Sequence, residues 1–290
     1  MSTDPLQLTL KVLEYTLVFA GAGLVLWLLV NPRQRQRWLG VHPLPQLTVS
    51  PAEFALGAAL IFLSGFVCNA VAQLLLAPYL TKNPDYKGLQ VLVINLANYA
   101  GALVGWRVLL PAAQRAWQFG LVAPPARSTR PASSWSEATG YGLGTLVVAL
   151  PIMYLCSWGW LSLLRAAGLP NGQQDLIADF LQTKSPFVVG GMLLMACVLA
   201  PIYEELLFRA ALFRFVRQKL GRTPALLVSG VAFGALHANW AGFVPLAVLG
   251  MLLALAYEAT GSIRVPIIAH GLFNLHSIIL LLTGFMPANP

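Results

Sequence analysis

The chain is a succession of apolar runs of about 20 residues, separated by segments that hold most of its charged residues. Eight runs can be distinguished, and they cover approximately residues 10–30, 54–76, 89–110, 140–164, 187–213, 223–240, 243–257 and 265–282. A helix of about 20 residues spans a hydrocarbon core of roughly 30 Å. The pattern therefore predicts an all-α, polytopic membrane protein with about eight transmembrane helices.

The composition supports a membrane protein and argues against a nucleic-acid partner. Hydrophobic residues make up 58% of the chain, charged residues 10%, and the mean hydropathy is +0.72, whereas a soluble domain carries roughly a quarter charged residues. The net charge of +8 comes from basic residues clustered in short loops, as in cytoplasmic loops of membrane proteins. We therefore expect the chain to lie in a lipid bilayer and to bind no nucleic acid.

The basic residues also predict an orientation in the membrane. The segments after the first, third, fifth and seventh runs hold Arg33, Arg35, Arg37, Arg115, Arg127, Arg130, Arg217, Lys219, Arg222 and Arg264, and the opposite side holds Lys11, Lys82, Lys87, Arg165 and Lys184. The positive-inside rule places the richer side in the cytoplasm and both termini outside. The start of the chain has both acidic and basic residues and lacks the pattern of a secretory signal.

The polar connections are expected to be linkers. Residues 111–137 are rich in Pro and Ser, and residues 171–183 have the pattern of a short amphipathic helix, which we interpret as a solvated linker in preference to a substrate gate. The chain would then form one integral membrane domain, with four N-terminal helices and their linkers in residues 1–186 and four further helices in residues 187–290.

The fifth run contains two adjacent carboxylates, Glu204 and Glu205, followed by Arg209. A charge at membrane depth costs a few kcal/mol or more, so it tends to be paired or functional. Glu205 precedes Arg209 by four residues, the favourable order for an ion pair on a helix. Glu204 points about 100° away and has no local partner. We therefore expect Glu205 and Arg209 to form a structural ion pair and Glu204 to be functional.

Further polar side chains recur at helical spacing in the later runs. Phe233 and His237 are four residues apart, and so are His270 and Asn274, which places each pair on one helix face. His276 lies six residues after His270, on a different face, and is expected to serve packing or to belong to the outer half of the membrane. A single membrane histidine is more often an interhelical hydrogen-bonding group than a catalyst.

Counting along the helices indicates that these groups share one depth. Glu204 lies 17 residues before Gly221 and His237 lies 16 after it, so an antiparallel hairpin brings them level. His270 lies nine residues after Gly261, and the levels agree if the first hairpin extends about two turns beyond the membrane. The groups would then converge about 10–15 Å below the cytoplasmic face.

Taken together, Glu204-Glu205-x-x-x-Arg209, Phe233-x-x-x-His237 and His270-x-x-x-Asn274 resemble the CPBP family, over roughly residues 187–283. This family contains the type II CAAX prenyl endopeptidases and bacteriocin-processing or self-immunity proteins. The resemblance implies an intramembrane endopeptidase with a conical active-site cavity, acting on membrane-associated proteins or peptides in a bacterial cell membrane. It implies that Glu204 and His237 activate a water and that His270 and Asn274 form an oxyanion site.

The chemistry of the residues is consistent with that assignment. Peptide hydrolysis needs a base for water and donors at the developing oxyanion, and an Asn amide and a histidine ring N–H are such donors. Two histidines with one or two glutamates could instead bind zinc and leave a site for water. The chain has no HExxH motif, and Glu205 is expected to be engaged by Arg209. We therefore favour a mechanism without a cofactor, with zinc as the alternative.

Two other function classes remain as alternatives. A transporter would place its ionisable residues near the bilayer midplane, often with inverted repeats, whereas the expected cluster lies nearer the cytoplasmic face. A non-catalytic immunity or scaffold protein would retain the Glu-Arg pair but has no need of the histidines on the later helices. The presence of these histidines together with the Glu-Arg pair favours the endopeptidase.

Overall fold

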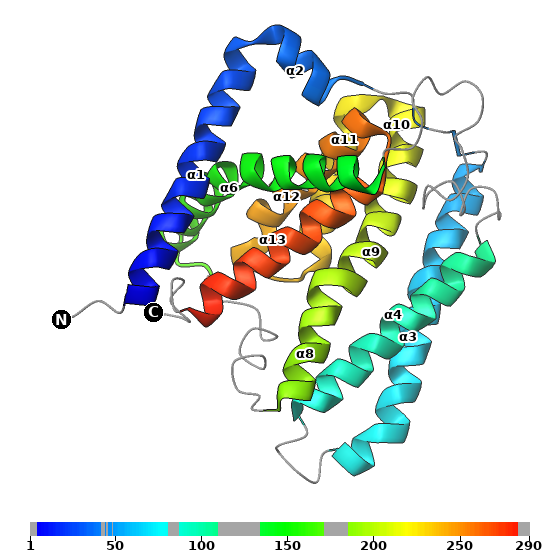
Figure 1. Ribbon diagram of the computed structural model, residues 1–290. Helices are drawn as coiled ribbons and strands as arrows, with labels where there is room; N and C mark the ends of the chain where they lie inside the picture. Colours follow the sequence, from blue (N-terminus) through cyan, green and yellow to red (C-terminus); the bar gives the residue numbers. More distant parts are fainter. Residues whose placement is uncertain are drawn as a thin grey trace.

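The computed structural model describes residues 5–41, 44, 46–47, 49–80, 87–109, 134–170 and 185–283, and every regular element in these ranges is helical (Figure 1). In chain order they are α1 (Pro5–Val30), α2 (Pro32–Leu39), α3 (Pro51–Leu80), α4 (Lys87–Leu109), α6 (Trp135–Ala166), α8 (Pro186–Leu194), η2 (Met195–Leu199), α9 (Ala200–Glu205), η3 (Leu206–Phe213), α10 (Arg214–Leu220), α11 (Arg222–Leu236), α12 (Trp240–Thr260) and α13 (Arg264–Leu282). The helix expected at 171–183 and nearly all of the 111–137 linker lie outside the described residues.

Each of the eight predicted spans corresponds to a helix, and the segments from α8 to α10 form one continuous span. Seven spans are long and apolar enough to cross a membrane, and the remaining span, α11, is a shorter apolar helix. The protein is therefore an all-α, multi-pass integral membrane protein, as predicted.

The helix α11 ends earlier than the apolar pattern predicts. The expected run of residues 223–240 stops being helical at Leu236, and α12 begins at Trp240, where the side chain of Asn239 accepts a hydrogen bond from the Gly242 N–H. A helix of 15 residues is only about 22 Å long. Helix α11 is therefore too short to cross a hydrocarbon core of roughly 30 Å by itself, and irregular backbone at membrane depth occurs only beside buried protein or a water-filled cavity.

The helices form a central group with α1 on one side and the pair α3 and α4 on the other (Figure 1). In the centre, α6 and α13 pack against each other, and α12 contacts α6, α11 and α13. Helix α1 packs against α6 on one side, and the antiparallel pair α3 and α4 lies on the other, where α4 contacts α8 and α9. Helix α9, which carries the two adjacent glutamates, lies between α13 and α4 (Figure 1).

The core around α9 is aromatic and tightly packed. Phe208 and Phe233 meet edge to face with their centroids 5.2 Å apart, and Phe213 packs against Tyr257 at 6.5 Å. On the neighbouring helix, a Cβ added at Gly271 would lie 2.3 Å from the Cys197 carbonyl oxygen. Only glycine therefore allows α13 to approach η2 this closely, and this approach brings the polar side chains of α13 to α9.

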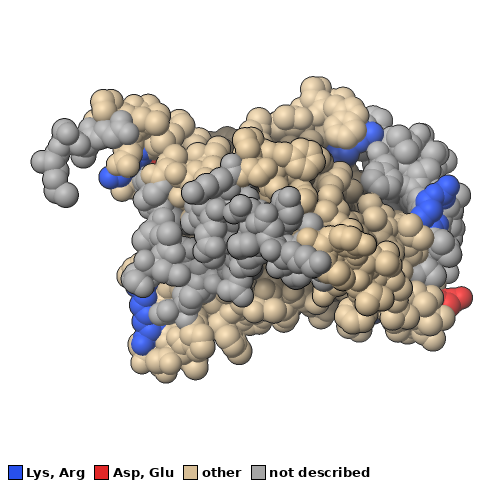
Figure 2. Space-filling model, turned by 90° about the horizontal axis from the view of Figure 1, so that it is seen from below, with Lys and Arg blue, Asp and Glu red and all other residues tan. Residues whose placement is uncertain are grey.

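Many of the described basic residues lie at one end of the helices. Helix α2, the α10–α11 turn and the start of α13 all lie at the upper end in Figure 1, and they carry Arg33, Arg35, Arg217, Lys219, Arg222 and Arg264. Seen from the opposite end, Lys and Arg side chains are confined to a few places near the rim of the described surface (Figure 2). This is the end that the positive-inside rule predicts to face the cytoplasm.

Candidate active site

The glutamates of α9 lie between two π-helical segments. The π-helix η2 ends at Leu199, α9 covers Ala200–Glu205, and the π-helix η3 begins at Leu206. Such segments are rare and often mark functional sites, because they break the regular hydrogen-bond ladder and redirect side chains. Here the carbonyl oxygen of Ala196, in η2, accepts a hydrogen bond from Asn274 Nδ2 on α13 at 2.8 Å.

Glu205 and Arg209 form a fully buried ion pair. Nη1 of Arg209 donates to Oε1 of Glu205 at 2.9 Å, and both side chains are 0% exposed. The Nη2 atom donates to the Gly250 carbonyl oxygen at 3.0 Å, and the guanidinium lies 4.6 Å from the centroid of the Phe233 ring. These contacts tie η3 to α11 and α12 and pair a charge that would be costly to bury alone, although Nε of Arg209 has no hydrogen-bond partner among the described residues.

His270 lies between the two carboxylates. Its Nδ1 atom is 2.9 Å from Oε1 of Glu205, and its Nε2 atom is 3.8 Å from Oε2 of Glu204. A carboxylate only accepts hydrogen bonds, so Nδ1 is the donor to Glu205. This bond fixes the ring orientation, and Nε2 can also donate only when the imidazole carries both protons.

His237 caps the end of α11 and faces the same oxygen of Glu204. Its Nδ1 atom donates to the Phe233 carbonyl oxygen at 2.8 Å, and its Nε2 atom lies 4.0 Å from Oε2 of Glu204. The next residue, Ala238, has φ of +48°, a conformation that non-glycine residues rarely adopt. This backbone turn sets the direction of the imidazole, and strained residues of this kind cluster at functional sites.

Glu204 therefore presents one oxygen to two imidazole nitrogens. The Oε2 atom is buried and has no hydrogen-bond partner among the described residues, although the side chain as a whole is 17% exposed. Distances of 3.8 and 4.0 Å are too long for direct hydrogen bonds and suit a bridging water molecule. The structure thus brings together three of the four residues that we expected to be catalytic.

The fourth, Asn274, lies on the same helix as His270 but is bound to Ala196. Within the described part of the chain, no hydrogen bond or ion pair joins Asn274 to Glu204, His237 or His270. The amide nitrogen has two hydrogens, so the bond to Ala196 occupies one and leaves the other for a further acceptor.

Phe233 has a larger part in the site than its sequence pattern suggested. Its side chain is 0% exposed, and its ring packs against His237 at 4.8 Å and against His270 at 5.5 Å, between centroids. The same ring lies under Arg209, and its carbonyl oxygen orients His237. The four-residue spacing to His237 was the only sequence signal for this residue.

A second polar cluster lies on another face of α13. His276 Nε2 is 2.7 Å from Oε2 of Glu14, and the Tyr154 hydroxyl donates to Oε1 of Glu14 at 2.7 Å. Glu14 is only 4% exposed. His276 therefore links α13 to α1 and α6 through hydrogen bonds, in addition to the packing role that its position predicted.

The described residues contain no group of three or more His, Cys, Asp or Glu side chains close enough to hold a metal ion. Glu205, which the zinc alternative could have used, is occupied by Arg209 and His270.

Comparisons with known proteins found similarity over about a third of the chain. Residues 186–276 match the family model described as type II CAAX prenyl endopeptidase Rce1-like, which confirms the resemblance drawn from the motifs. A curated protein of Bacillus subtilis (strain 168), named "Putative membrane peptidase YdiL", is 33% identical over 89 residues, 31% of this chain and 36% of that protein. The match thus spans about a third of each chain. No solved structure matches the chain.

Proposed function

We propose that the protein is an intramembrane endopeptidase in which Glu204 activates the water that hydrolyses a peptide bond of a membrane-associated protein or peptide. The observation that carries the proposal is the convergence of His237 Nε2 and His270 Nε2 on the buried Oε2 atom of Glu204, at 4.0 and 3.8 Å. The match of residues 186–276 to the CAAX endopeptidase model supports a peptidase, and the roles of individual residues rest on their geometry.

In the first step, a water between Glu204 and His237 attacks the carbonyl carbon of the substrate. The water donates one hydrogen to Oε2 of Glu204 and the other to Nε2 of His237, which is an acceptor in the neutral ring because Nδ1 donates to Phe233. As the new C–O bond forms, the first proton passes to Glu204 and the carbonyl oxygen becomes negatively charged. Glu204 is then a neutral acid.

The negative oxygen needs donors before the intermediate can collapse. We assign this role to the free hydrogen of the Asn274 amide and to Nε2–H of His270 in its doubly protonated form, in which each ring N–H faces one carboxylate. The C–N bond then breaks, and Glu204 returns its proton to the leaving nitrogen. Water is consumed, one peptide bond becomes an acid and an amine, and the enzyme is regenerated.

The turn between α11 and α12 suits this chemistry. Its irregular backbone sets the position of His237, and irregular backbone at membrane depth accompanies either buried protein or a cavity reached by water. A hydrolase inside a membrane needs such access, whereas an immunity or scaffold protein does not.

The proposal is tested in cells by comparing membrane-derived peptides. Strains that carry the wild-type protein or Glu204→Ala are analysed by quantitative proteomics of peptide termini in the membrane fraction. The proposal predicts a set of new termini that depends on Glu204 and is lost in the variant at equal protein abundance. Identical termini in the two strains would favour the non-enzymatic alternatives, a scaffold or immunity protein or a transporter.

A further inference from the structure

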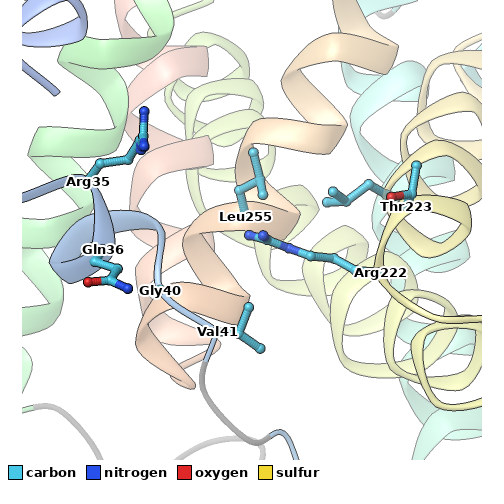
Figure 3. A pocket seen from close by; sticks show the side chains of 8 residues that line it. Arg35, Gln36, Gly40, Val41, Arg222, Thr223 and Leu255 are labelled. Carbon is cyan, nitrogen blue, oxygen red and sulfur yellow. The ribbon is translucent and has the colours of Figure 1, made fainter. Parts of the chain in front are cut away.

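A cavity of about 570 Å³ opens at the end of the helices where many of the basic residues lie. It lies between α2 on one side and the start of α11 on the other, with α12 behind it, and Arg35 and Arg222 project from opposite walls (Figure 3). Its volume lies within the range of small-ligand sites in proteins. The cavity contains none of the residues proposed for catalysis.

The charge of this cavity is positive. Glu258 is 1% exposed, and its two oxygens accept hydrogen bonds from Arg217 Nε at 2.7 Å and from Arg222 Nε at 2.6 Å. One carboxylate is thus shared by two guanidinium groups, which leaves one net positive charge. Arg35 adds a second positive charge. No acidic side chain is among the described residues that line the cavity, so an anion is the ligand that its charge favours.

The walls of the cavity are amphipathic. Gln36 and Thr223 lie beside the arginines, whereas Val41 and Leu255 form an apolar part of the lining. Hydrogen-bonding and charged groups therefore adjoin apolar surface, which suits a ligand that combines an anionic head with an apolar tail.

The position of α2 places the cavity at the membrane surface. This short basic helix follows directly on the membrane-spanning α1, and its Trp38 packs edge to face on Tyr141 of α6 with centroids 5.7 Å apart. Trp side chains and basic helices are typical of the interface between lipid and water. Basic pockets between transmembrane helices on the cytoplasmic side bind acidic lipid headgroups.

From these observations we propose that the cavity binds the headgroup of an anionic phospholipid. Arg35 and Arg222 contact the phosphate, because a guanidinium matches phosphate oxygens with two parallel donors. The polar groups of Gln36 and Thr223 bind the remainder of the headgroup, and the acyl chains leave along the apolar wall. The bound lipid joins α2 to the α11–α12 hairpin, and its binding does not depend on the proposed peptidase activity.

The test uses purified full-length protein in a mild detergent, titrated with short-chain phosphatidylglycerol or with phosphatidylcholine of the same chain length. Lipid retention is measured by native mass spectrometry and the affinity by the rise in thermal midpoint. Arg35→Gln is compared with Arg33→Gln as a control. Both substitutions remove one charge from the same exposed helix, but Arg33 does not line the cavity. Glycerol phosphate and inorganic phosphate serve as lipid-free probes.

We expect the wild type to retain phosphatidylglycerol in preference to phosphatidylcholine. Arg35→Gln should weaken this binding about fivefold, the loss that corresponds to one arginine near an anionic lipid, and Arg33→Gln should change it less than twofold. Equal effects of the two substitutions would overturn the site, since they would indicate only a diffuse surface charge. Equally tight binding of glycerol phosphate would overturn the lipid assignment in favour of a soluble phosphate ligand.

Discussion

The Nδ1 atom of His270 lies 2.9 Å from Oε1 of Glu205, the same oxygen that accepts a hydrogen bond from Arg209. Glu205 thus has two partners on two different elements. It neutralises a buried guanidinium on η3, and it holds the imidazole of α13 in the orientation that directs Nε2 towards Glu204. The ion pair expected from the sequence is therefore also a support for the proposed active site.

The two roles of Glu205 can be separated by paired substitutions. Arg209→Ala alone strands a buried carboxylate and should lower the free energy of unfolding by about 3–5 kcal/mol. Removing both charges with Arg209→Met and Glu205→Gln should cost less, and the Gln oxygen can still accept from His270. The double variant Arg209→Met with Glu205→Leu should be about as stable as the Met and Gln double variant. It should lose the orientation of His270, and with it most of the activity.

These variants are compared by thermal unfolding in detergent and by cleavage assays. If Arg209→Ala unfolds like the wild type but is inactive, the ion pair belongs to the catalytic group and the structural role is wrong. If the Gln and Leu double variants are equally active, Glu205 does not orient His270.

The helices and the Glu205–Arg209 pair could be predicted from the sequence because both depend on local spacing. Apolar runs of about 20 residues define the spans, and a Glu four residues before an Arg faces it on the same side of a helix. The convergence of Glu204, His237 and His270 also followed from counting residues to the turns at Gly221 and Gly261.

Features that depend on backbone irregularity were not predictable in this way. The π-helical segments on either side of α9 follow from no local spacing, and the first of them contains Cys197, which Gly271 approaches closely. The early end of α11 at Leu236 leaves no mark in the apolar pattern, because Leu236, Ala238 and Trp240 continue the apolar run through the turn. The contacts of His276 with Glu14 join residues far apart in the chain, and no local spacing indicates them.

The oxyanion role assigned to Asn274 predicts a defined loss of turnover. Asn274→Ala removes the donor to Ala196 and the second amide hydrogen together, and loss of one oxyanion donor typically lowers turnover about 10²–10³-fold. Substrate affinity should change little, because the donor acts in the transition state. Steady-state kinetics in proteoliposomes measure both quantities, and a rise in KM with unchanged kcat would instead make Asn274 a substrate-binding residue.

The mechanism without a cofactor predicts that activity does not depend on a metal. Purified protein should cleave its substrate at an unchanged rate after incubation with a strong chelator, and elemental analysis should find much less than one zinc per chain. Loss of activity on chelation, with recovery on addition of zinc but not magnesium, would establish the zinc alternative and make the imidazole Nε2 atoms candidate ligands.

The orientation of the chain is tested by accessibility of single cysteines. In a background without Cys68, Cys156 and Cys197, the exposed positions Lys219 and Ala167 are each replaced by cysteine and treated with an impermeant thiol reagent in intact cells. The positive-inside rule predicts that the cysteine at position 167 is labelled in intact cells. The cysteine at position 219 should be labelled only after the cells are lysed. The opposite pattern would show that the termini lie in the cytoplasm.

The central claim is that Glu204 is the base that activates water. Its most direct test is the single-turnover cleavage rate of Glu204→Gln on a substrate peptide identified from the cellular termini, measured in proteoliposomes with protein of unchanged thermal midpoint. Gln keeps the size and hydrogen-bonding capacity of the side chain but cannot take the proton, so cleavage should fall to background while substrate binding persists. Cleavage by Glu204→Gln at a rate close to that of the wild type would contradict the claim.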